Sequence, residues 1–140
     1  MTPTRPQGIL FVGEKRSKMA IRMGVTWQDG RLSAKTLDEA VRPLGLARLG
    51  IPSTMPYDVL NAYRDYGDYD MQALETIAMR HRQGWLVIGM GRAAQHALDW
   101  ANIPYTSMIH PAARGHIRLR ARYQAHVSTV LQPWLTMGSM

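Results

Sequence analysis

Residues 8–13 form the short apolar run Gly8-Ile9-Leu10-Phe11-Val12-Gly13, which is bounded by glycines at both ends. A continuous apolar run of this length is typical of a β-strand buried on both faces, as in a parallel sheet. We therefore predict that it is the first central strand. The charged turn Glu14-Lys15-Arg16-Ser17 follows directly, at the end of a strand where open α/β sheets bind their ligands.

The rest of the chain alternates between helix and strand patterns. Ser33 or Thr36 is suited to cap a helix, with Glu39 completing a capping box, and Asp70 is suited to cap the next one. Pro133 is expected to bend or end the last helix. The further predicted elements are a loop at 23–31, a helical stripe at 37–44, a short strand at 57–61, a helix at 71–82, a strand at 85–89, a helix after Gly91, a strand at 103–109 and a helix from about residue 117.

This alternation predicts an α/β fold with a mostly parallel central sheet and helices on both faces. A chain of 140 residues has room for one hydrophobic core. We expect a single α/β domain at 8–135, an N-terminal extension at 1–7 and a flexible tail at 136–140.

Composition narrows the chemistry. There is no cysteine, which excludes disulfides, thiolate zinc sites, iron–sulphur clusters and cysteine nucleophiles. The histidine spacings indicate no metal site. Gly89-Met-Gly91-Arg-Ala-Ala94 has the form of a dinucleotide fingerprint, but no acidic residue follows Asp99 to hold a ribose, so the glycines are interpreted as a tight turn. We expect no cofactor and no metal.

No apolar run is long enough to span a membrane, and the N-terminus lacks the apolar stretch of a signal peptide. These features predict a cytoplasmic protein without membrane contact. The net charge of +7 indicates a polyanionic partner. Basic residues dominate before Thr36 and acidic residues from Asp58 to Glu75, while no acidic residue follows Asp99. If the two basic ends meet in space, they form one electropositive face.

His110 stands apart from the other histidines because it follows a predicted strand, is held by Pro111 and precedes a basic helix start. We expect it to lie at the same sheet edge as Glu14 and to line the same cleft. Arg114, Arg118 and Arg122 are candidate phosphate contacts. For Trp27, core burial and base stacking are comparable interpretations.

These residues together carry a resemblance. Gly13-Glu14 resembles the first motif of the uracil-DNA glycosylase superfamily, closest to its iron–sulphur branch, and His110-Pro111-Ala112 resembles the second. Thr26-Trp27 with Leu37-Asp38 resembles the segment whose aromatic ring stacks on the flipped base. Asn61 stands at the place of a base-reading asparagine, and 85–94 is similar to the strand and helix before the second motif. The similarity spans most of residues 8–131.

The resemblance implies base excision, in which a nucleotide is flipped out of the nucleic acid and its N-glycosidic bond is hydrolysed. Glu14 would stabilise the sugar cation and orient water, and His110 would stabilise the departing base. Trp27 and Asn61 would bind the base. DNA rather than RNA is the expected nucleic acid. The expected phosphate-binding residues are Lys15, Arg16, Ser17, Arg114, Arg118 and Arg122.

Two features depart from the family pattern. Lys15-Arg16-Ser17 replaces the Pro and Gly that normally continue the first motif, and the cluster-binding cysteines are missing. One alternative is therefore a non-catalytic member of the same fold that binds nucleic acid or a nucleotide through the altered loop. A second alternative is a basic interaction module for an acidic protein.

Overall fold

The computed structural model describes residues 5–29, 32–48, 55–112 and 120–135. Its centre is a five-stranded sheet in which every strand pair is parallel, with the order β2-β3-β1-β4-β5. The strands are β1 (Ile9–Gly13), β2 (Leu46–Arg48), β3 (Met55–Asn61), β4 (Leu86–Met90) and β5 (Thr106–Met108). The helices are α1 (Lys18–Met23), α2 (Ser33–Val41), α3 (Met71–Arg82), α4 (Arg92–Trp100) and α5 (Arg120–Leu135), with short 3-10 turns η1 (Trp27–Asp29) and η2 (Arg42–Leu44). This is the predicted α/β fold.

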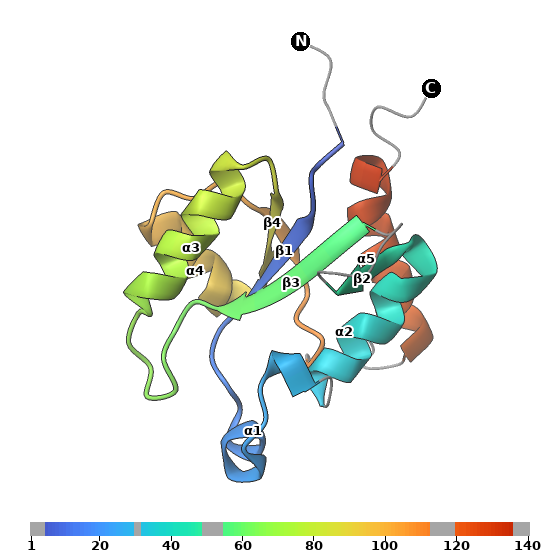
Figure 1. Cartoon of the computed structure of the whole chain (residues 1–140). Helices are drawn as coiled ribbons and strands as arrows, with labels where there is room; N and C mark the ends of the chain where they lie inside the picture. Colours follow the sequence, from blue (N-terminus) through green and yellow to red (C-terminus); the bar gives the residue numbers. More distant parts are fainter. Residues whose placement is uncertain (1–4, 30–31, 49–54, 113–119, 136–140) are drawn as a thin grey trace.

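Two layers of helices cover the sheet, with α3 and α4 on one face and α2 and α5 on the other (Figure 1). The alternation of side chains along β1 supplies both cores. Ile9 and Phe11 pack towards α2 and α5, whereas Leu10 and Val12 pack towards α3 and α4. All four are essentially inaccessible to solvent. The continuous apolar run of β1 therefore reflects burial on both faces.

Several predicted features are confirmed. β1 is central, because it pairs with β3 on one side and β4 on the other. Asp70 caps α3 by accepting a hydrogen bond of 3.0 Å from the backbone N–H of Ala73, and α3 has the predicted bounds. Gly91, at a φ of 86°, precedes α4 as a tight turn. Its left-handed backbone is one that glycine adopts without strain.

Other features differ from the sequence-based expectation. α1 and β2 were not predicted, and η1 forms within the expected loop at 23–31. α2 begins at Ser33 after Leu32, whose φ is 58°, so neither Ser33 nor Thr36 is its N-cap. β5 is shorter than predicted, since only three residues pair with β4. The predicted start of the last helix, at about residue 117, lies outside the described residues.

Pro133 does not end the last helix, because α5 continues to Leu135. Proline removes one backbone donor and crowds the carbonyl four residues before it. Close to the end of a helix, this interrupts few later hydrogen bonds. The opposite side of α5 continues to contribute to the core through Leu131 and Leu135.

Candidate functional site

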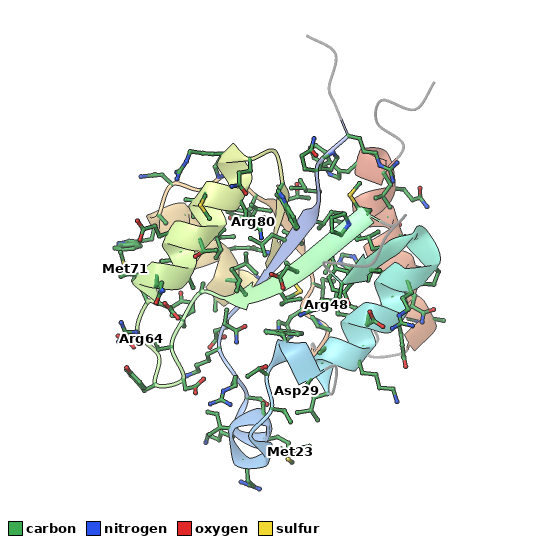
Figure 2. The ribbon with its side chains drawn as sticks, viewed as in Figure 1. Met23, Asp29, Arg48, Arg64, Met71 and Arg80 are labelled. Carbon is green, nitrogen blue, oxygen red and sulfur yellow. The ribbon has the colours of Figure 1, made fainter. Side chains whose placement is uncertain are left out.

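A small solvent-open pocket lies at the carboxyl edge of the sheet, with a cavity volume of about 90 Å³. Its wall combines the loop after β1, the end of β3, the region of η1, the start of α2 and the loop after β5. Figure 2 places Met23 and Asp29, which flank the segment carrying Trp27, at this end of the molecule. The polar and aromatic lining residues include Lys15, Arg16, Ser17, Trp27, Asn61 and His110.

Parallel strands bring Gly13 and Asn61 side by side, since they are register partners at the ends of β1 and β3. The indole Nε1–H of Trp27 donates a hydrogen bond of 2.7 Å to Oδ1 of Asn61. A Cβ atom on Gly13 would lie 2.8 Å from that oxygen and 3.2 Å from the Trp27 ring. The pair thus depends on the missing side chain at Gly13, because this approach leaves no room for a methyl group.

Trp27 serves the core and the pocket together. Its half-buried ring packs against the hydrophobic cluster under α2 and α5. The same ring lines the pocket and lies 6.0 Å from the His110 ring between centroids, tilted by 59°. The two sequence-based interpretations of Trp27 are compatible, since burial of one part of the ring leaves another part in the pocket wall.

The protonation of His110 follows from one contact. The backbone N–H of Ala112 donates a hydrogen bond of 3.0 Å to Nδ1 of His110. A backbone N–H can only donate, so Nδ1 must carry a lone pair and the neutral ring must carry its proton on Nε2. Burial also lowers the pKa of His110 below its ordinary value of 6.5. The pocket therefore contains a neutral imidazole with an Nε2–H donor.

Helix α5 determines where His110 stands by holding the preceding residue. His126 accepts a hydrogen bond of 3.0 Å from the backbone N–H of Ile109 at Nε2, and the Tyr123 hydroxyl donates one of 3.0 Å to its carbonyl. Tyr123 and His126 are three residues apart, so they share one face of α5. In the sequence, His126 has none of the context that distinguishes His110. The sequence signal for this role is the three-residue spacing of Tyr123 and His126, which places them on one helix face but does not identify Ile109 as the residue they contact.

Glu14 and His110 each follow a parallel strand and lie at the same edge of the sheet, as predicted. The pocket lining nevertheless contains His110 and not Glu14. Successive residues of a strand face opposite sides, so Glu14 points away from the side that Gly13 faces, towards α3 and α4. There it contributes to raising the pKa of Tyr63, after the larger effects of burial and of Tyr69. The expectation that both side chains line one cleft is wrong.

The predicted phosphate-binding residues fall into three groups. Lys15 lines the pocket and has no hydrogen-bond or ion-pair partner among the described residues. Arg16 forms an ion pair with Asp65 at 2.6 Å, and the Ser17 hydroxyl caps α1 by accepting from the N–H of Ala20. Arg122 is exposed on α5, outside the pocket lining, and Arg114 and Arg118 lie outside the described residues.

The Arg16–Asp65 pair has a structural consequence for the pocket. Arg16 donates through Nε and one terminal nitrogen to the Asp65 carboxylate, which lies in the turn after β3. The pair lowers the pKa of Asp65, chiefly through the hydrogen bond. Arg16 therefore anchors the loop that carries Lys15 to the turn after β3.

The two depressed histidine pKa values predict a pH-dependent stability. Burial lowers the pKa of His110 and of His126 in the folded protein. As the pH falls below about 6.5, the unfolded chain takes up protons that the folded chain resists, so folding stability is lost. We expect the urea midpoint to decrease between pH 7.5 and pH 5.5. His126→Gln should reduce this decrease and His81→Gln, on exposed α3 surface, should not. A midpoint that rises on acidification would contradict the assignment.

No group of three or more acidic, histidine or cysteine side chains in the described part of the chain could hold a metal ion. Within the same residues, no helix is long and apolar enough to cross a membrane. Comparisons with protein-family models, with curated proteins and with solved structures gave no match.

Proposed function

We propose that this protein binds a nucleobase turned out of a nucleic acid, DNA in preference to RNA, and hydrolyses its N-glycosidic bond. The observation that carries the proposal is the neutral His110, with its Nε2–H donor, in one pocket with Trp27 and Asn61. Enzymes that act on bases take them out of the stack into such a pocket and bind them by stacking and hydrogen bonds. We place this activity in the cytoplasm.

The pocket suits a base better than a complete nucleotide. The cavity volume of about 90 Å³ is smaller than the roughly 150 Å³ that admits benzene, so a base would lie partly in the open mouth of the pocket. Trp27 offers an aromatic surface, and Asn61 offers an amide beside it. Lys15 lies at the wall, where it can contact a phosphate of the attached nucleotide. The sugar and backbone would remain outside the cavity.

The chemistry requires stabilisation of a leaving base. Water adds to the anomeric carbon, the bond from that carbon to the base nitrogen breaks, and its electron pair moves onto the base. The proton that the water loses is returned through solvent to the departing base. An Nε2–H donor aimed at a base oxygen stabilises the charge that develops there. The resemblance to uracil-DNA glycosylases supports this assignment, because His110-Pro111-Ala112, which resembles their second motif, lies at the same sheet edge as Gly13-Glu14.

A second candidate is binding without catalysis. It is favoured by one observation: Glu14, the expected carboxylate of the reaction, lies outside the pocket lining, whereas Lys15 lies within it. An ammonium group suits phosphate binding and adds no stabilisation to a sugar cation. In this version, the protein recognises an exposed base or a nucleotide and leaves the N-glycosidic bond intact.

One assay separates the candidates. Oligonucleotides that each carry one modified or deaminated base are incubated with the protein and treated with alkali, which breaks the strand at an abasic site. Strand cleavage for at least one base supports the enzyme. Binding without cleavage for every base in the panel supports the second candidate. Absence of any salt-dependent binding would reject both and favour an acidic protein partner.

We expect Lys15→Ala to weaken nucleic-acid binding for all sequences. It removes a phosphate contact, so the slope of log affinity against log salt concentration should fall by about one unit. The control is Arg82→Ala, which removes an equal charge at the exposed end of α3, near the opposite edge of the sheet. Fluorescence anisotropy at several salt concentrations measures both. Equal slopes for Lys15→Ala and wild type would exclude Lys15 from the interface.

A further inference from the structure

The two pocket side chains next to Trp27, those of Asn61 and His110, have the same hydrogen-bonding polarity. An indole N–H can only donate, so the contact from Trp27 identifies the bonded atom of the Asn61 amide as its oxygen. That oxygen also faces Gly13, where even a Cβ atom would approach it to 2.8 Å. Trp27 and the backbone at Gly13 therefore block a ligand from reaching Oδ1. The group that Asn61 retains for a ligand is its Nδ2 amide, which has two donors.

His110 shows the same polarity for an analogous reason. The backbone N–H of Ala112 occupies the lone pair on Nδ1, which leaves Nε2–H as a donor. Asn61 and His110, the two pocket side chains next to Trp27, thus both offer donors. Elsewhere in the wall, the Thr26 hydroxyl donates to Asp29 and can otherwise only accept, and the Ser33 hydroxyl can rotate to either role.

We propose that the pocket selects bases that present two adjacent hydrogen-bond acceptors, such as O6 and N7 of a 6-oxopurine or O2 and N3 of cytosine, and discriminates against uracil and thymine. This inference rests on the proposed function, because it concerns the base bound in the same pocket. Guanine shows the pair O6 and N7 on one edge, whereas adenine replaces O6 with an amino donor. Uracil and thymine carry N3–H between their two carbonyls, so that donor would face the donors of Asn61 or His110.

The size of the effect follows from the cost of an unsatisfied donor. A polar group that loses water and finds no partner on binding weakens the complex by roughly tenfold or more. Two pairs of ligands isolate this effect, because the members of each pair differ at one edge only. Cytosine and uracil differ at positions 3 and 4 of the same ring. Hypoxanthine and adenine differ at positions 1 and 6 and share N7.

The wild-type test uses deoxynucleoside monophosphates that carry these four bases, measured by calorimetric titration. The same bases are then placed opposite an abasic site in otherwise identical duplexes, which lowers the cost of flipping. We expect cytosine to bind about tenfold more tightly than uracil, and hypoxanthine about tenfold more tightly than adenine. Preference in the duplexes alone assigns the ligand to nucleic acid, whereas preference in the monophosphates as well admits a free nucleotide.

An isosteric variant tests the mechanism of the preference. Asn61→Asp keeps the acceptor for Trp27 and replaces the Nδ2 donors with a second acceptor, so the ratio of cytosine to uracil affinity should fall below one. The matched control is Asn102→Asp, at an exposed loop position after α4, which makes the same charge change away from the pocket. Its ratio should equal that of wild type. A ratio cancels the general repulsion of phosphate by the new charge.

The outcomes separate this inference from the function on which it rests. Wild-type protein that binds uracil as well as cytosine overturns the selection by the Asn61 and His110 donors but leaves base binding intact. An unchanged ratio in folded Asn61→Asp, judged by its thermal transition, also overturns it. Protein that binds none of the four bases in either form rejects both this inference and the proposed function.

Discussion

Replacing His110 with alanine is expected to lower the rate of base release by roughly two to three orders of magnitude, while nucleic-acid affinity changes little. The reason is the Nε2–H donor. Its position is determined by the hydrogen bond from Ala112 and by the two hydrogen bonds between α5 and the backbone of Ile109. The donor therefore needs little rearrangement during the reaction. Alanine leaves the negative charge on the departing base without this partner. Single-turnover rates and anisotropy measure the two effects separately.

A conservative variant and a surface control sharpen this test. His110→Gln offers an amide N–H in place of the imidazole N–H, so it should recover part of the lost rate. His81→Ala removes a histidine from the exposed surface of α3 and should retain the full rate. Equal rates for His110→Ala and wild type would remove His110 from the chemistry. A parallel loss of affinity and rate would make it a binding residue instead.

Gly13→Ala is expected to disrupt the pocket and weaken base binding by at least about tenfold. The new Cβ would lie 2.8 Å from Oδ1 of Asn61 and 3.2 Å from the Trp27 ring. Gly13 cannot retreat without loosening its pairing with β3, so the side chains must separate and the bond between them is lost. Overpacking of this kind destabilises a protein by about 1–3 kcal/mol. Urea unfolding and calorimetric titration measure the two effects.

Gly84→Ala separates loss of stability from loss of the pocket. Gly84 lies in the turn before β4 and has a φ of 90°. A Cβ atom added there would lie 3.3 Å from the Gln7 side chain. A side chain in this left-handed conformation costs about 1–2 kcal/mol. This variant should therefore lose similar stability and retain its base affinity. Equal affinity losses in both variants would show that destabilisation alone weakens binding.

Local sequence was sufficient for the elements whose signals lie within a few residues. The apolar run of β1, the Asp70 cap of α3 and the glycine turn before α4 were all predicted, because burial and capping leave marks in adjacent positions. The three-residue β2 and the six-residue α1 were missed. Segments so short contain less than one full period of a pattern, and their form depends on what they pack against.

For the candidate site, the chain order predicted that the residues after β1 and β5 would reach one edge, because parallel strands present their carboxyl ends together. Which side chains share a pocket depended on strand parity and register. Asn61 and Gly13 face one side, and Glu14 turns to the other. Likewise, Arg16 and Lys15 are neighbours with similar charge. Only the approach of Asp65, 49 positions away from Arg16 in sequence, distinguishes them, because it pairs with Arg16 and not with Lys15.

The sequence by itself determined the fold class and the set of groups near the carboxyl edge, since both follow from local burial patterns and strand order. The tertiary structure alone decided the hydrogen-bonding polarity of those groups. An asparagine and a histidine can each donate or accept, and no local pattern distinguishes the two states. The donors of Trp27 and Ala112 select one state for each, because an N–H without a lone pair forces its partner to accept.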